Sequence, residues 1–141
     1  MDYLLPTFKA VSMIFAAASI YTGVQAIFDP IGFSTGFGLP LKTTPKSKDA
    51  PEPIDRNRIS KSYVSLLGVR QLGTAVTLVI FATQNKWTEI ATILAVIGIL
   101  VAGTDGIFLW QAGRPDLARF HAIPGAGIAA LAAGTIYSGV L

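Results

Sequence analysis

Residues 63–110 read YVSLLGVRQLGTAVTLVIFATQNKWTEIATILAVIGILVAGTDGIFLW. This stretch contains two apolar segments, at about 63–83 and 88–110, separated by a short polar turn at 84–87. A bilayer core of about 30 Å is crossed by about 20 apolar residues in a helix. An isolated strand in lipid would leave its backbone polar groups without partners. The stretch therefore predicts two antiparallel transmembrane helices joined by a tight turn.

Two further apolar segments, at about 8–28 and 121–140, flank this pair. The 141 residues are 52% hydrophobic and only 13% charged, with a mean hydropathy of +0.57. An ordinary soluble domain has about 25% charged residues. We therefore predict an all-α fold, a four-helix transmembrane bundle formed by one membrane domain over 1–141. A cleaved signal peptide is the alternative for the first segment, but its apolar run is long for a signal core.

The exit from the first segment has the signals of a short helix. Asp29 is typical of a helix N-cap, and Pro30 suits the first helical position that follows. Phe33 and Phe37 lie four residues apart and so share one face, and Gly38 ends the helix. We predict a short interfacial helix here, with the two phenylalanines as membrane anchors.

The basic residues predict how the bundle is oriented. Eight of the 11 lysines and arginines lie in the first and third connections, and only Lys9 and Lys86 lie at the opposite ends of the helices. The positive-inside rule therefore predicts that the long connections, including a polar and Pro-rich loop at 41–62, face the cytosol. Acidic residues are interleaved with the basic ones in this loop, so the charge pattern does not indicate a nucleic-acid partner.

Small residues recur at helical intervals in three of the segments. Helices in lipid gain little from hiding apolar surface, so close packing of small side chains has to hold them together. The rows are Ala18, Thr22 and Ala26 in the first segment, Ala102 and Gly106 in the third, and Ala122, Ala126, Ala130, Gly134 and Ser138 beside Gly125, Ala129 and Ala133 in the fourth. They predict packing within one bundle, with a homodimer face as the alternative.

Besides Lys9 and Glu89 at the span edges, two charged residues lie well inside the predicted spans, where each costs about 2.5–3.5 kcal/mol and needs a partner or water. Arg70 follows Tyr63 by about 10 Å, and Asp105 precedes Trp110 by about 8 Å, both measured from the cytosolic side. Antiparallel threading matches these depths, so we expect Arg70 and Asp105 to meet. A purely structural ion pair is the alternative to a functional site.

Further polar residues occur at the same side of the bundle and predict a pocket open to the cytosolic leaflet. The expected catalytic residues are Arg70, Asp105 and His121, and the expected substrate-binding residues are Gln25, Tyr63, Gln71 and Trp110. The chain has one histidine and no cysteine, which excludes thiolate and multi-histidine metal sites. We predict no metal and no cofactor.

Several short motifs resemble a known family. They are Asp29-Pro30, Phe33, Phe37-Gly38-Leu39-Pro40, Gly68-Val69-Arg70, Asp105 and His121. In these motifs the chain resembles the small four-helix membrane proteins catalogued as domain of unknown function 4267, in a fungal-type member. The resemblance implies a four-helix membrane bundle. Because fungal members often occur in natural-product pathways, it also implies an endoplasmic-reticulum setting and an apolar substrate.

These observations lead to one main hypothesis and two alternatives. The main one is a cofactor-free cyclase or isomerase in which Arg70 stabilises developing negative charge, Asp105 orients Arg70 or moves a proton, and His121 is the acid or base. The first alternative is a non-catalytic accessory subunit that positions a membrane oxidase such as a cytochrome P450. A transporter subunit is disfavoured, because the polar residues occur at one end only.

Overall fold

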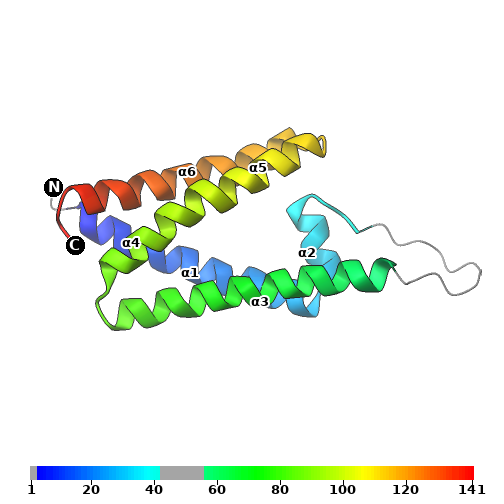
Figure 1. Ribbon diagram of the computed structural model, residues 1–141, viewed down its shortest axis with the longest axis horizontal. Coiled ribbons are helices and arrows are strands. Elements are labelled where there is room, and N and C mark those ends of the chain that lie inside the picture. The colour runs from blue at the N-terminus through cyan, green and yellow to red at the C-terminus, as the bar shows by residue number, and fades with distance from the viewer. Residues whose placement is uncertain (1–2, 42–55) are drawn as a thin grey trace, which may run out of the picture.

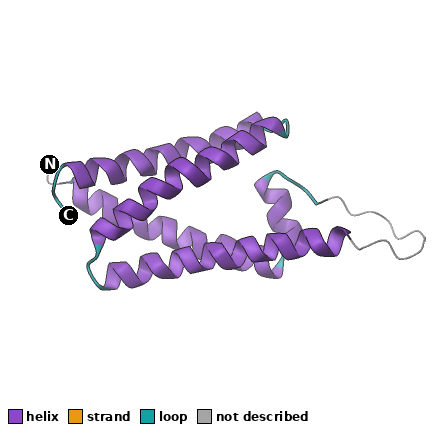
Figure 2. Cartoon of the chain, in the orientation of Figure 1, coloured by secondary structure: helices purple, strands orange, loops and turns teal. Residues whose placement is uncertain are grey.

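The computed structural model describes residues 3–41 and 56–141. Within these residues the chain is built of helices and short loops, with no strand (Figure 2). The helices are α1 (Leu4–Phe28), α2 (Pro30–Phe37), α3 (Arg56–Thr83), α4 (Trp87–Val96), the π-helical turn η1 (Ile97–Val101), α5 (Ala102–Gln111) and α6 (Pro115–Tyr137). Four segments are long and apolar enough to span a membrane: α1, most of α3, the continuous α4–η1–α5, and α6. The predicted all-α architecture with four membrane-spanning helices is therefore confirmed.

Two helices are longer than their apolar segments. α3 begins at Arg56 rather than at Tyr63, and α6 begins at Pro115 rather than at His121. Hydropathy marks only the part of a helix that suits lipid, whereas backbone hydrogen bonding continues into polar flanks. The predicted cytosolic loop at 41–62 is thus helical from Arg56 onward, and its part at 42–55 lies outside the described residues.

The four spans form two antiparallel pairs. α1 packs on α3, and α4–η1–α5 packs on α6 (Figure 1). The two pairs come together at the end where both termini and the α3–α4 turn lie, which we call the closed end, and they separate toward the end that holds α2. A core cluster at the closed end joins all four spans, through Phe8 of α1, Leu78 of α3, Ile90 and Leu94 of α4, and Ala132 of α6.

α1 and α3 approach each other through glycine. A Cβ atom added at Gly68 would lie 2.7 Å from the carbonyl oxygen of Gly23 and 2.8 Å from the Cβ of Ala26. No side chain fits at that distance, so glycine is what lets the two backbones come so close. The buried row of α1 is Ser12, Ala16, Ser19, Gly23 and Ala26. Of the predicted row, Ala26 is buried but Ala18 is exposed, so that part of the prediction is wrong.

The π-helical turn η1 keeps the small residues of the third span facing α6. Gly98, Ala102 and Gly106 follow at intervals of four, and each lies against small residues of α6. In an ideal α-helix, positions four apart drift around the axis by about 40° per step. A π-turn closes its hydrogen bonds over five residues instead of four and offsets this drift. The predicted packing role of Ala102 and Gly106 is thus consistent with the structure, although η1 itself was not foreseen.

α6 packs through part of one of its two predicted rows: Gly125 and Ala129 are buried as predicted, whereas Ala133 is exposed. Its buried residues are Ala118, Gly125, Ala129, Ala132 and Thr135, at intervals of seven, four, three and three. Ala126, Ala130 and Gly134 of the other predicted row are exposed, so that part of the prediction is wrong, because a strict interval of four winds around an α-helix. These three residues form an unpartnered small-residue face on α6.

The short helix α2 begins and ends where the sequence predicts. The Asp29 carboxylate accepts a hydrogen bond from the Gly32 amide at 2.9 Å, and Gly38 ends the helix with a φ of 97°. The rings of Phe33 and Phe37 stack 5.8 Å apart, and both side chains are half-buried. They were predicted to anchor the helix in lipid, but Phe37 instead packs on the second helix pair.

Candidate functional site

His121 and Asp105 come together where α5 and α6 pack closely. A Cβ atom added at Gly106, the residue after Asp105, would lie 3.0 Å from the Cβ of Ala122, the residue after His121. Asp105 and His121 are both half-buried, and their charges are close enough to interact. No direct hydrogen bond joins the carboxylate to the imidazole, so the interaction between these two residues is one between charges. We call these two residues the Asp105–His121 group.

α2 forms the aromatic side of this group. The ring of Phe37 lies 4.6 Å from the imidazole of His121, and Phe120 packs edge-on against the same imidazole at 5.8 Å. Arg114 donates a hydrogen bond through its Nη1 to the carbonyl oxygen of Gly38 at 3.2 Å. α2 is thereby fixed to the start of α6, and the imidazole of His121 contacts two aromatic rings.

A proline one turn after His121 adds a polar atom to this region. Pro124 lies inside α6 and has no amide hydrogen to donate. The carbonyl oxygen of Phe120, four residues earlier, therefore lacks the helical hydrogen bond that it would otherwise accept. In a membrane such a carbonyl needs another donor, from water, a side chain or a ligand.

The predicted meeting of Arg70 with Asp105 is wrong. Arg70 is exposed on α3, and it forms no ion pair with Asp105, although the structure describes both residues. The reason is topological: α5 packs on α6, α3 packs on α1, and α3 and α5 make no extended contact. Depth along the membrane normal sets the height of a side chain but not the direction in which it points. The catalytic role expected for Arg70 stays a prediction, and it now lacks the contact on which it was based.

The other predicted residues are spread over the α2 end. Gln71 donates a hydrogen bond to the Ser19 hydroxyl at 3.1 Å, which links α3 to α1 and is a packing role. Tyr63 and Trp110 are 69% and 57% exposed, as expected for aromatic residues at a membrane surface. Gln25 is half-buried on α1. The structure thus brings together two of the predicted site residues, Asp105 and His121.

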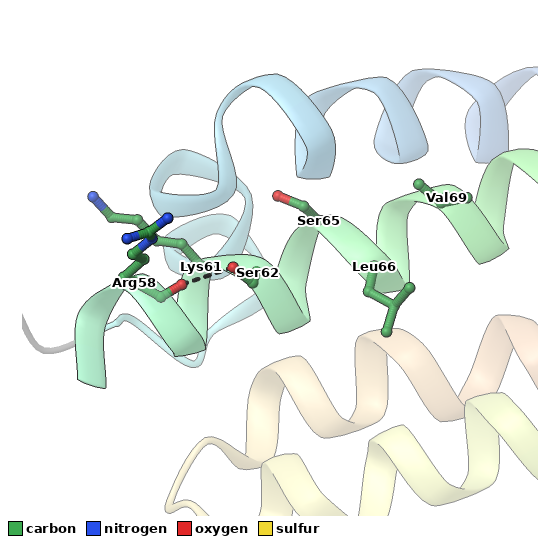
Figure 3. Close-up of a pocket in the computed structure, with 6 residues that line it drawn as sticks. All are labelled: Arg58, Lys61, Ser62, Ser65, Leu66 and Val69. Carbon is green, nitrogen blue, oxygen red and sulfur yellow. Dashed lines mark hydrogen bonds between the residues drawn. The ribbon is translucent and has the colours of Figure 1, made fainter. Parts of the chain in front are cut away.

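A second feature, not foreseen from the sequence, lies on α3. A groove of about 500 Å³ is lined by Arg58, Lys61, Ser62, Ser65, Leu66 and Val69, and we call it the α3 groove (Figure 3). The Ser62 hydroxyl donates to the Arg58 carbonyl oxygen at 2.9 Å, the bond drawn dashed in Figure 3. The sequence signal was available, because these residues recur at three- and four-residue intervals, but 56–62 was assigned to a loop.

The structure offers no evident metal centre in the part of the chain that it describes. Across 3–41 and 56–141, no three histidine, aspartate or glutamate side chains come together. The single ion pair found there joins Arg119 to Asp116 at 4.0 Å, and both side chains are largely exposed. An exposed pair of this kind contributes little to stability.

The fold is that of a small protein with four helices suited to span a membrane, in which Asp105 and His121 lie close together where α5 packs on α6. The family model described as Domain of unknown function (DUF4267) matches residues 16–135, which is most of the chain. The chain belongs to this family, as the sequence motifs indicated. No curated protein and no solved structure matches it.

Proposed function

We propose that the chain is a cofactor-independent enzyme that isomerises or cyclises an apolar intermediate by proton transfer. The observation that carries the proposal is the Asp105–His121 group, in which the close contact of Gly106 with Ala122 brings a carboxylate near the chain's one imidazole. Histidine exchanges protons readily near neutral pH, and a neighbouring carboxylate stabilises the imidazolium form. Arg70 is not required for this step.

The chemistry needs no other reactant. His121 takes a proton from one position of the substrate, Asp105 stabilises the imidazolium that forms, and the imidazolium returns the proton at another position. A double bond moves or a ring closes, no electrons are gained or lost, and substrate and product have the same mass. Exclusion of water by the surrounding apolar helices strengthens each of these electrostatic interactions.

The pathway and the cell compartment are part of the proposal. The family resemblance supports a natural-product (secondary-metabolite) pathway and an endoplasmic-reticulum membrane. The basic residues support a cytosolic location for the α2 end. Glycosylation acceptor sites test the orientation: a site added at the N-terminus should be glycosylated in the lumen, whereas a site inserted into 42–55 should not.

Conservation of mass gives the sharpest test of function. Deletion of the coding sequence in the producing organism should accumulate a compound with the mass of the normal product but a different chromatographic retention time. Wild-type protein should restore the product, whereas Asp105→Asn and His121→Gln should lower its rate of formation by about 100-fold or more. Glu89→Gln is the matched control, because Glu89 is an exposed carboxylate on α4 at the opposite end.

Two outcomes would contradict the proposal. Full activity in both Asp105→Asn and His121→Gln would exclude the proton-transfer group. Accumulation of a compound that lacks one oxygen atom would instead indicate loss of an oxidase step.

The exposed small-residue face of α6 favours a second candidate, an accessory subunit that positions a membrane oxidase such as a cytochrome P450. Ala126, Ala130 and Gly134 would let a partner helix approach closely. Ala130→Leu should then abolish co-purification with the oxidase, while Asp105→Asn should not affect it. If the same face instead forms a homodimer, Ala130→Leu should lower the mass of the purified particle from that of a dimer to that of a monomer.

A further inference from the structure

The α3 groove changes polarity in one direction along its helix. The order is basic, hydroxyl and then apolar: Arg58 and Lys61, Ser62 and Ser65, Leu66 and Val69. Figure 3 shows that the nitrogen atoms of Arg58 and Lys61 and the hydroxyl of Ser65 lie on the same side of α3. A phospholipid has the same order, from its phosphate through the glycerol esters to the acyl chains.

The depth of the groove matches a bilayer surface. Gly68 lies level with Ala26, since a Cβ at Gly68 would be 2.8 Å from the Ala26 Cβ, and α1 ends at Phe28. At about 1.5 Å per residue, Ser65 is level with the end of α1, and Lys61 lies about 6 Å beyond Ser65. The headgroup layer on each side of a bilayer is about 5–8 Å thick. Taking the end of α1 as the edge of the hydrocarbon layer places Lys61 at headgroup height and Val69 within the hydrocarbon.

We propose that the α3 groove binds an anionic phospholipid. The guanidinium of Arg58 and the ammonium of Lys61 contact the lipid phosphate, the Ser65 hydroxyl lies at the height of the glycerol esters, and an acyl chain follows Leu66 and Val69. A guanidinium suits phosphate oxygens geometrically, and an ammonium adds a second positive charge. The cytosolic leaflet is rich in such lipids. This assignment does not depend on the proposed catalytic function.

Native mass spectrometry tests the site directly. Purified protein in neutral detergent is given equal amounts of dioleoylphosphatidylserine and dioleoylphosphatidylcholine, and the retained lipids are counted. We expect wild-type protein to prefer phosphatidylserine by about tenfold. In the double variant Arg58→Gln/Lys61→Gln, this preference should fall to about twofold or less.

The matched control removes two charges from the closed end. Lys9→Gln/Lys86→Gln lowers the net charge equally but leaves the α3 groove unchanged, so its preference should equal that of wild-type protein. An equal loss in both double variants would overturn the proposal, because it would show only a nonspecific effect of charge. Absence of any preference in wild-type protein would overturn it as well.

A competition experiment separates a lipid site from a site for a soluble anion. Inorganic phosphate and glycerophosphoserine carry the anionic group without acyl chains, so neither should displace the lipid at equal concentration. Displacement by either one would reassign the groove to a soluble anion. If the double variant fails to fold, wild-type protein is measured at about 0.05 and 0.5 M salt. The preference should fall several-fold at the higher concentration, and an unchanged preference would contradict the proposal.

Discussion

The ring of Phe37 lies 4.6 Å from the imidazole of His121, although 84 positions separate the two residues along the chain. This contact joins α2, which extends the first helix pair, to α6 of the second pair. At the closed end the two pairs are held by a shared apolar core, whereas at the other end they are held by α2 and its contacts with the start of α6. The environment of the Asp105–His121 group therefore depends on how firmly α2 is docked.

Phe37→Ala should weaken this docking. The variant loses a half-buried ring and its contacts with Phe33 and His121, which we expect to destabilise the protein by about 1–3 kcal/mol. Phe28→Ala is the control, since Phe28 is 82% exposed. Thermal unfolding in detergent gives the midpoint temperature of each variant. Equal midpoints for the two variants would show that α2 does not support the fold.

Gly38→Ala should weaken the same junction through the backbone. Gly38 has a φ of 97°, a conformation that strains alanine, and a Cβ there would collide with Leu117. We expect a loss of about 1–3 kcal/mol. Gly36→Ala, two residues earlier with no atom within 4 Å of the added Cβ, should be neutral or slightly stabilising. Chemical unfolding of the two variants side by side is the measurement. If Gly38→Ala is as stable as Gly36→Ala, the contact of Gly38 with the start of α6 does not stabilise the protein.

Gly68→Ala should force α1 and α3 apart. The new methyl group would lie 2.7 Å from the Gly23 carbonyl oxygen, so we expect destabilisation of about 1–3 kcal/mol. Gly73→Ala on the same helix meets nothing within 4 Å and should gain up to about 1 kcal/mol. Unfolding in mixed micelles compares them. An order of stability opposite to this one would exclude the close contact of α1 with α3.

Cross-linking distinguishes the observed helix partners from those expected from the sequence. The chain has no cysteine, so introduced pairs give no background. Gly106→Cys with Ala122→Cys should form a disulfide, because the Cβ atoms would start 3.0 Å apart and need only a small adjustment. Arg70→Cys with Asp105→Cys should not. Gel mobility before and after reduction shows whether each pair has formed a disulfide. Efficient disulfide formation by the second pair would show that positions 70 and 105 are neighbours after all.

The sequence was sufficient for the spans and for α2 because both depend on local signals. Hydropathy located four apolar segments, and Asp29, Pro30 and Gly38 marked the ends of α2 by their capping chemistry. Helix partners could not be found in this way. In a soluble helix the apolar face identifies the core, but in these spans nearly every face is apolar, so Ala126 and Ala129 look alike although one is exposed and the other buried.

The candidate site was predictable in part for the same reason. Asp105 and His121 were selected because polar groups in lipid are costly, and that argument needs no knowledge of neighbours. The pairing of Arg70 with Asp105 required the direction of each side chain around its helix, which depth alone does not give. η1 also changes the phase of the third span before Asp105, and no residue pattern in 97–101 announced it.

The separation of the two helix pairs toward α2 also suggests how the molecule would come apart. Partial opening of a folded protein begins where buried apolar contacts are fewest. That place is the junction of Gly38 with Arg114 and Leu117, whereas the cluster around Phe8, Leu78 and Ile90 should hold longest. Partial unfolding should therefore begin at the α2 end. Amide hydrogens there should exchange well before those of the residues around Phe8, Leu78 and Ile90 at the closed end.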